Sequence, residues 1–376
     1  MMSVASSTDR ERDKAFMAAA LALGRREIGA TAPNPAVGAL LVQDDVIVGR
    51  GWTRAGGRPH AETGALREAG ERARGATLYV TLEPCSHYGA TPPCAVSIIA
   101  AGVARVVSAL HDPDSRVAGR GHAMLRAAGV TVTTGILEDE ARRANLGHVL
   151  RVTEGRPAVT LKLAETADGF AAGTVGAPRL KITGPAADNK VQMLRATHNA
   201  IMVGIGTARA DNPRLDVRLA GFKGRQPRRV VIDSNLSLPL GAHVVTTARE
   251  QSTLVIAAED APASHEEALA KAGIEIIRVA RNGGGRVDMG SALKALALRG
   301  MTRILSEGGP ILGSRLIVDG HADDVVLLTS KASWEQIGHP ALDEQARAEL
   351  ADASHYRLVE DAMLENDRLR RYERML

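Results

Sequence analysis

The feature that most constrains this chain is the repeated alternation of short β-branched runs with helical segments. In the first half, the apolar runs 77–81 and 105–110 are separated from one another by a segment with helical character, 94–101. Strands that alternate with helices are typical of βαβ units, in which helices cover both faces of the sheet. The sequence therefore predicts an α/β fold. The expected strands of this half are 37–42, 46–48, 77–81, 105–110 and 130–134, and the expected helices are 9–29, 60–73, 94–101, 121–128 and 138–151.

A break in this pattern divides the chain. With 376 residues and roughly 100 to 200 residues per domain, two domains are expected. Glycine and proline interrupt the pattern in 153–157, which predicts domains at 1–152 and 153–376. The second half is again α/β. Its expected strands are 158–163, 200–203, 229–232, 253–256, 274–279, 303–305 and 324–328, and its expected helices are 186–195, 291–298 and 311–317.

Composition excludes several classes of protein. Aromatic residues make up 2% of the chain, which disfavours a protein that stacks single-stranded nucleic acid on its rings. The net charge of +4 suits small anionic ligands better than a DNA duplex. The longest apolar run, 15–23, is shorter than the roughly 18 residues that a membrane helix needs. Two cysteines are too few for a disulfide scaffold, so we expect a cytoplasmic protein whose thiols serve metal or redox chemistry.

Three metal-binding side chains occur at the ends of predicted elements. His60 lies at a helix start, Cys85 follows a strand, and Cys94 begins the next helix. Imidazole and thiolate are ligands that Zn²⁺ prefers, and three of them leave one position open for water, as in catalytic sites. Glu62 follows His60 by two residues, a spacing that does not share one face of a helix, so His60 must lie at the helix cap.

The order of these residues indicates a deaminase. Zinc bound by two thiolates is a weak acid, so its water needs a nearby base, and Glu62 is the candidate. His-x-Glu followed by Pro-Cys and a second cysteine is the zinc-deaminase signature, although eight residues separate Cys85 from Cys94 here instead of two. Two other interpretations stay open: a histidine and cysteines that are simply buried, or a structural zinc with His87 as fourth ligand.

Other short motifs are ambiguous. Asn34, between two prolines, is either a turn residue or a carboxamide that holds the edge of a pyrimidine. Gly204 and Gly206 lack the third glycine of a Rossmann fingerprint, because Arg209 occupies that position. The glycines of 308–310, between a strand and a helix, fit either a phosphate site or a plain turn.

Several motifs together resemble one known family. They are Pro-Asn-Pro-x-Val-Gly at 33–38, His-Ala-Glu at 60–62, the long spacer between the cysteines in 83–94, Val-Gly-Ile-Gly-Thr at 203–207, Asp-Asn-Pro at 211–213 and Glu-Gly-Gly-Pro at 307–310. The chain thereby resembles the bifunctional diaminohydroxyphosphoribosylaminopyrimidine deaminase and 5-amino-6-(5-phosphoribosylamino)uracil reductase of riboflavin biosynthesis.

The resemblance implies two folds and two reactions. It implies an N-terminal cytidine-deaminase-like α/β/α sandwich, with Zn²⁺ on His60, Cys85 and Cys94 and proton transfer by Glu62. It also implies a C-terminal dihydrofolate-reductase-like α/β domain that uses NADPH. The pyrimidine ribosyl phosphate is first deaminated by hydrolysis, and its ribosyl group is then reduced to ribityl.

The resemblance also assigns binding residues and partners. The cofactor residues are Ala164, Lys181, Thr207, Asp211, Ser234, Gly309, Pro310, Ile311, Leu312, Gly313, Ser314 and Arg315, and the substrate residues are Asn34, Arg179, Arg195, Leu215, Arg218 and Glu307. Arg179 and Lys181 stand where the family has serine and tryptophan, and such cations can hold a phosphate. Arg195 and Arg218 would otherwise be solvated surface charges.

The expected partner is a small molecule, with no nucleic acid and no membrane, and the chain is expected to form a homo-oligomer, a dimer or tetramer. A tRNA base deaminase with an accessory domain shares the His-Ala-Glu core and is the rival enzyme, which the scarcity of aromatic residues disfavours. A zinc-stabilised binding module without activity is the non-enzymatic rival.

Overall fold

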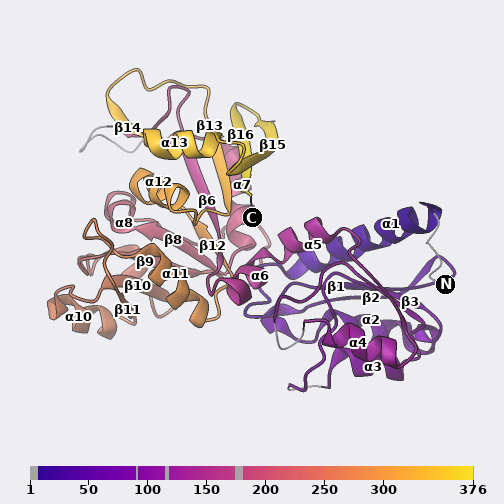
Figure 1. Cartoon of the computed structure of the whole chain (residues 1–376). Coiled ribbons are helices and arrows are strands. Elements are labelled where there is room, and N and C mark those ends of the chain that lie inside the picture. Colours follow the sequence, from indigo (N-terminus) through magenta and orange to yellow (C-terminus); the bar gives the residue numbers. More distant parts are fainter. Residues whose placement is uncertain (1–6, 90–91, 115–117, 174–180, 376) are drawn as a thin grey trace. The chain divides into compact units, whose positions relative to one another are not determined.

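The computed structural model describes residues 7–89, 92–114, 118–173 and 181–375 (Figure 1). Contacts between residues divide the chain into two units, Met1–Gly155 and Arg156–Leu376. The ranges 1–152 and 153–376 stay a prediction as functional domains. Among the described residues, none of the helices is both long and apolar enough to cross a bilayer.

The first unit is built on a five-stranded sheet with the order β2-β1-β3-β4-β5. Strands β3, β4 and β5 are parallel, and β1 pairs antiparallel with both β2 and β3. The strands are β1 (Gly38–Gln43), β2 (Val46–Trp52), β3 (Thr77–Val80), β4 (Arg105–Ser108) and β5 (Thr131–Thr134). The helices are α1 (Ser7–Gly24), α2 (Ala61–Ala69), α3 (Cys94–Ala100), α4 (Arg120–Ala127), α5 (Glu138–Ala144) and α6 (Leu146–Thr153), with 3₁₀ turns at Arg25–Glu27, Ala55–Gly57 and Gly70–Ala73.

Helices cover both faces of this sheet. Figure 1 shows α1 and α5 on one side and α2, α3 and α4 on the other. This arrangement confirms the α/β/α sandwich. The single helix expected over 138–151 is wrong, because the chain breaks at Asn145, whose side-chain amide donates to the Ala141 carbonyl at 3.1 Å. An asparagine that binds its own backbone in this way competes with helix formation.

Strand β2 and helix α2 of the first unit are in contact through their backbones. A Cβ atom added at Gly51, in β2, would lie 1.9 Å from the carbonyl oxygen of Ala61, at the start of α2. Only a residue without a side chain allows this approach. The glycine therefore lets the first turn of α2, which carries Glu62 and follows His60, lie directly on the sheet.

The second unit contains a nine-stranded sheet with the order β11-β10-β9-β8-β12-β6-β13-β16-β15, and a two-stranded sheet of β14 and β7. The strands from β11 to β13 are parallel, whereas β16 pairs antiparallel with β13 and β15. The strands are β6 (Ala158–Glu165), β7 (Phe170–Gly173), β8 (Ala200–Gly204), β9 (Arg228–Ile232), β10 (Thr253–Ala258), β11 (Glu275–Val279), β12 (Arg303–Ser306), β13 (Asp324–Thr329), β14 (Gly338–Pro340), β15 (Tyr356–Leu364) and β16 (Asp367–Arg374). The helices are α7 (Pro185–Ala196), α8 (Ile205–Asp211), α9 (His243–Thr246), α10 (Glu266–Lys271), α11 (Met289–Leu298), α12 (Pro310–Val318) and α13 (Glu344–Ala351).

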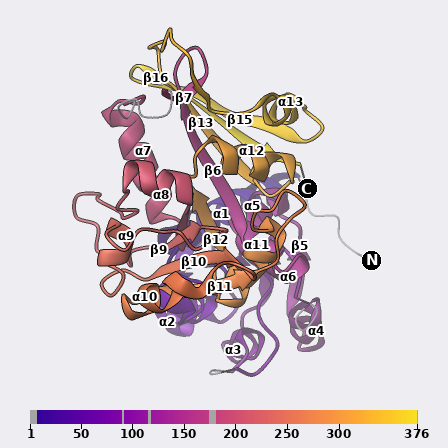
Figure 2. The ribbon, with the colours of Figure 1, turned by 90° about the vertical axis from the view of Figure 1, so that its left-hand side faces the viewer.

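The parallel strands of this sheet are buried on both faces. In β8, Met202 packs into a cluster with α11 and α12, while Ile201 and Val203 pack into another with α8, α9 and α10. Strands covered on both sides are rich in Val, Ile and Leu in place of alternating polar residues. Figure 2 shows β6, the first strand of the unit, in the middle of the sheet, where β12 and β13 are its neighbours.

Candidate active sites

The three predicted metal-binding side chains lie together in the first unit. His60 precedes α2 with an extended backbone (φ −66°, ψ 160°), so its side chain leaves the helix in a different direction from Glu62. His60 Nδ1 lies 3.4 Å from Cys94 Sγ and 3.8 Å from Cys85 Sγ. The ligand atoms of all three residues lie within 4.8 Å of one another. One imidazole and two thiols at this separation fit a zinc ion with a further position for water.

The thiol pair favours a thiolate before any metal binds. The Cys94 thiol donates a hydrogen bond to Cys85 and lowers the pKa of Cys85 to about 4, with a further contribution from His60. The same contact raises the pKa of Cys94. The backbone N–H of Cys94 also donates to Cys85 Sγ at 3.3 Å. Negative charge is thus stabilised at Cys85, where a cation is to bind.

Glu62 lies beside this cluster and is 4% exposed. Burial raises the pKa of its carboxyl group, although His60 opposes the shift. A carboxyl group whose pKa lies closer to neutrality exchanges protons more readily during catalysis than an ordinary glutamate. The environment of Glu62 therefore suits a proton carrier.

Glu83, to which the sequence assigned no role, organises the loop that leads to Cys85. Its Oε1 accepts from the N–H groups of Gly121 (3.0 Å) and His122 (3.3 Å). Its Oε2 accepts from those of Gly119 (3.0 Å) and Asp112 (3.3 Å). The carboxylate thus satisfies free N–H groups at the start of α4 and joins three segments.

Asn34 serves as a turn residue in this structure. Its N–H donates to the Thr31 carbonyl at 3.1 Å, and its side-chain amide donates to the Gly57 carbonyl at 3.0 Å. These bonds tie the turn to the loop that precedes His60. The side-chain oxygen Oδ1 takes part in neither bond.

In the second unit, the predicted binding residues gather at one edge of the sheet. Ser234, Glu307 and Ala164 lie at or just beyond the ends of β9, β12 and β6, and Thr207 belongs to α8, which follows β8. These four strands are parallel neighbours, so their carboxyl ends share one edge. Ligands of open α/β sheets bind at this edge.

The β12–α12 turn faces the β8–α8 turn across this edge. A Cβ atom at Gly309 would lie 3.1 Å from Thr207 Oγ1. Gly309 caps α12 without a side-chain hydrogen bond, and Pro310 has no N–H to donate. The remaining N–H groups of the first turn, those of Ile311 and Leu312, point out of the helix end, an arrangement that binds phosphate groups. The segment after β8, for which the sequence predicted no element, forms helix α8.

The other predicted cofactor residues differ from one another in burial and in their contacts. Ser314 is buried and its Oγ accepts from the N–H of Asp343 at 3.0 Å. Arg315 forms an ion pair with Asp319 at 2.6 Å. Gly313 is buried within α12, and Asp211 is the last residue of α8. Lys181 is exposed and precedes α7, while Arg179 lies outside the described residues.

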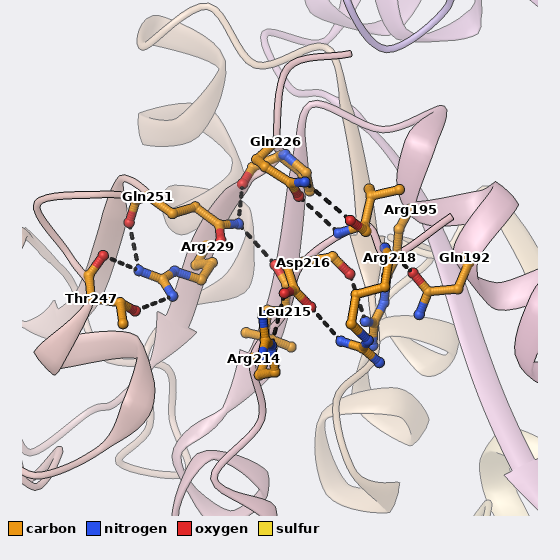
Figure 3. Close-up of polar contacts among 12 residues, drawn as sticks. Gln192, Arg195, Arg214, Leu215, Asp216, Arg218, Gln226, Arg229, Thr247 and Gln251 are labelled. Carbon is orange, nitrogen blue, oxygen red and sulfur yellow. Dashed lines mark hydrogen bonds and ion pairs between the residues drawn. The ribbon is translucent and has the colours of Figure 1, made fainter. Parts of the chain in front are cut away.

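Three of the predicted substrate residues, Arg195, Leu215 and Arg218, belong to one polar network (Figure 3). Arg195 and Glu307 form a two-bond ion pair, with Nε–Oε1 2.6 Å and Nη2–Oε2 2.7 Å, and Arg195 also donates to the Asp216 carbonyl at 2.9 Å. The Asp216 carboxylate binds Arg214 at 2.8 Å and also Arg218. Burial opposes ionisation of Asp216, but the hydrogen bonds from both arginines keep its pKa below the ordinary value.

Side chains outside the predicted set hold the backbone of this segment. Gln192 accepts from the Arg218 N–H at 2.8 Å, and Gln251 donates to the Leu215 carbonyl at 2.9 Å (Figure 3). Leu215 is 1% exposed and has a positive φ of 53°. Its side chain therefore packs in the core, while Arg218, half exposed, is available to an anion.

Comparison with known proteins identifies the family. A family model described as the cytidine and deoxycytidylate deaminase zinc-binding region matches residues 10–110, and one described as the RibD C-terminal domain matches residues 157–330. The riboflavin biosynthesis protein RibD of Aquifex aeolicus is 39% identical over 318 residues, which are 85% of this chain and 86% of that protein. The chain belongs to the RibD family.

Solved structures of RibD proteins agree over nearly the whole chain. RibD of Acinetobacter baumannii (form 1) has 33% identity and a TM-score of 0.85, covering 98% of this chain and 100% of that one. The diaminohydroxyphosphoribosylaminopyrimidine deaminase/5-amino-6-(5-phosphoribosylamino)uracil reductase of Thermotoga maritima has 31% identity and a TM-score of 0.82, covering 97% and 99%.

Membership of the RibD family confirms the predicted activities. This chain is a bifunctional enzyme of riboflavin biosynthesis, with a deaminase activity and a reductase activity. Its cofactors are Zn²⁺ and NADPH. The rival prediction, a tRNA base deaminase with an accessory domain, is not favoured, because the RibD match extends through the second unit.

Proposed function

We propose that the first unit deaminates a diaminopyrimidinone ribosyl phosphate with a zinc ion held by His60, Cys85 and Cys94. The observation that carries this proposal is the convergence of these three ligands within 4.8 Å of one another, beside the buried Glu62. The name of the Thermotoga maritima relative supplies the substrate class. The same name supports the second step, reduction of the ribosyl group of the deaminated product.

In this proposal, Glu62 transfers the protons of the deamination. When bound, zinc supplies the acidity that makes a water molecule nucleophilic at neutral pH. Glu62 accepts the proton of the attacking water and returns it to the amino group, which leaves as ammonia. Asn34, whose Oδ1 is not used in its turn, orients the amino-bearing edge of the ring. Water and the diaminopyrimidinone thus yield the uracil-type product and ammonia.

In the second unit, we propose that NADPH lies along the carboxyl edge of the parallel strands. The first turn of α12 binds a phosphate group of the cofactor through its N–H groups. Arg218 binds the phosphate of the substrate, and the Arg195–Glu307 pair fixes the segment that carries it. When bound, NADPH would supply the hydride for the ribosyl carbon, and a proton from water would complete the reduction.

The deaminase proposal is tested by the Glu62→Gln variant, which keeps the shape of the side chain but cannot carry the proton. Release of ammonia should fall by roughly 10²- to 10⁴-fold. NADPH oxidation with the deaminated product should be unchanged. Glu68→Gln, in an exposed glutamate of the same helix, is the matched control and should retain both rates. Ammonia release at the parental rate in Glu62→Gln would disprove the assignment.

The remaining expectations about partners are also proposals. We infer that the chain does not act on nucleic acid, which its small net charge supports. Assembly into a homo-oligomer is supported by the edge strand β15, on which Leu358, Val359 and Met363 are exposed. Light scattering of the purified protein would test assembly, and a mass of one chain would contradict it. The cytoplasmic location stays a prediction that cell fractionation can test.

A further inference from the structure

A second group of metal-binding side chains lies in the first unit, and the proposed deaminase chemistry does not use it. Glu83 follows β3, His111 lies in the loop after β4, and His122 is in the first turn of α4. Glu83 Oε2 lies 3.5 Å from His111 Nδ1 and 3.7 Å from His122 Nδ1. The two imidazole rings meet edge to face, with centroids 4.8 Å apart.

These separations match those between the ligands of a metal ion. Nitrogen and oxygen ligands lie about 2.1 Å from a first-row divalent ion, which places neighbouring ligand atoms of a tetrahedron about 3.4 Å apart. The ligand atoms of the three residues all lie within 4.8 Å of one another. Both contacts to Glu83 are too long for good hydrogen bonds, so the spacing is not explained by direct hydrogen bonding.

His122 provides an independent sign that a ligand is missing. Its side chain is fully buried, yet neither ring nitrogen has a hydrogen-bond partner among the described residues. Buried polar atoms are nearly always paired, and an exception points to an ion or a water. A neutral imidazole has a lone pair on one ring nitrogen that it can offer to a cation.

We propose that Glu83 Oε2, His111 Nδ1 and His122 Nδ1 bind a second divalent transition-metal cation, of the class of Zn²⁺, Co²⁺ or Ni²⁺. Two imidazoles and one carboxylate suit this class better than Mg²⁺ or Ca²⁺, which prefer oxygen ligands. The His111 side chain is 55% exposed, so water completes the coordination from the solvent side. Glu83 Oε2 accepts two hydrogen bonds from backbone N–H groups, and the cation displaces the longer one, the 3.3 Å bond from Asp112.

The role of this cation is structural. It joins the end of β3, the loop after β4 and the start of α4, which Glu83 already connects through backbone N–H groups. Gly121 allows this close contact, because a Cβ atom there would lie 2.0 Å from the Pro84 carbonyl oxygen. Cys85 follows directly, so the second ion steadies the segment that carries a ligand of the first.

Zinc stoichiometry tests the proposal. In equilibrium dialysis of the full chain against micromolar Zn²⁺, we expect two ions per chain for the parent and one for His111→Ala and His122→Leu. His355→Ala is the matched control, since His355 is 51% exposed and paired with Glu349, and it should retain two ions. A His111→Ala variant that binds as many ions as the parent overturns the proposal. If His122→Leu does not fold, the exposed His111 variant still decides the question.

Cobalt distinguishes this site from the proposed deaminase site. Cobalt on Cys85 and Cys94 produces thiolate-to-metal charge-transfer absorption, whereas cobalt on His111, His122 and Glu83 produces only weak visible bands. Cys94→Ser should remove the charge-transfer band and leave the second site filled, and His111→Ala should do the reverse. Failure of the deaminase site would therefore remove a different signal from failure of the second site. Loss of the charge-transfer band in His111→Ala, with the weak bands retained, would contradict the assignment.

Discussion

His198 illustrates how one residue of this chain resists protonation. It is buried in the second unit, where Nδ1 donates to the Leu194 carbonyl at 2.6 Å and Nε2 accepts from Thr160 Oγ1 at 2.9 Å. Burial and the nearby Arg303 lower the pKa of His198 to about 3. The folded protein therefore keeps the ring neutral, with both nitrogens satisfied.

This residue makes the second unit sensitive to acid. Between pH 6.5 and about 3 the unfolded chain binds a proton at His198 and the folded chain does not, so stability falls as the pH falls. Relative to His198→Asn, the parent should lose about 1.4 kcal/mol more per pH unit in this window. Urea unfolding followed by Trp334 fluorescence, in a Trp52→Phe background, measures this difference. His339→Asn, at an exposed histidine, should match the parent, and equal slopes for parent and His198→Asn would contradict the prediction.

The residues of the candidate sites were predictable where a motif contained them. His60, Glu62, Cys85 and Cys94 belong to a signature whose spacing could be recognised, and the structure brings them together. Glu83 and Asp216 were not assigned, because their partners are backbone groups and arginines that only the folded chain brings near. Similarly, nothing in the sequence places His111 beside His122.

Among the elements, the fully buried strands were predictable, and the two strands of the C-terminal hairpin were not. Strands such as β8 and β10 are continuous apolar runs flanked by turns, a pattern that is easily recognised. Strands β15 and β16 were missed because one face is exposed and charged residues interrupt the apolar pattern. Helices α8, α9 and α10 have seven, four and six residues, too few to show a helical period.

The contact between β2 and α2 predicts the effect of a single methyl group. Gly51→Ala places a Cβ atom within 1.9 Å of the Ala61 carbonyl, so α2 must move away from the sheet and take His60 and Glu62 with it. We expect a loss of about 1–3 kcal/mol in stability and weaker zinc binding. Gly241→Ala is the control, because a Cβ atom there meets nothing within 4 Å. Thermal unfolding and zinc content measure both effects, and a Gly51→Ala variant indistinguishable from Gly241→Ala would exclude this role.

The segment 214–218 predicts a separation between binding and turnover in the reductase reaction. Asp216→Asn weakens the ion pairs with Arg214 and Arg218, so Arg218 loses its fixed position. We expect KM for the ribosyl phosphate to rise roughly tenfold, the equivalent of about 1.4 kcal/mol, with kcat nearly unchanged. Asp260→Asn, in an exposed carboxylate paired with Arg281, should leave both constants unchanged. A fall in kcat at constant KM would show that Asp216 acts otherwise.

At the scale of the molecule, each unit has its own sheet and its own core. The described core of the first unit is one cluster around the five-stranded sheet, and the second unit contributes three clusters of its own. The proposed zinc ligands all belong to the first unit and the predicted NADPH residues to the second. The two activities should therefore respond to different treatments.

Removal of metal tests this independence. Dialysis against a strong chelator should abolish release of ammonia, because the water near Glu62 is no longer activated. NADPH oxidation with the deaminated substrate should retain its parental rate, and added Zn²⁺ should restore deamination. Both rates are measured on the same sample. A parallel loss of NADPH oxidation would show that the metal supports the second unit as well.

The central position of β6 has a consequence for how the chain is made. This strand leaves the ribosome first among those of its sheet, yet its partners β12 and β13 begin only at Arg303 and Asp324. Pairings between segments so distant along the chain form slowly. During synthesis, the apolar faces of β6 therefore stay without their final neighbours until most of the second unit has been translated.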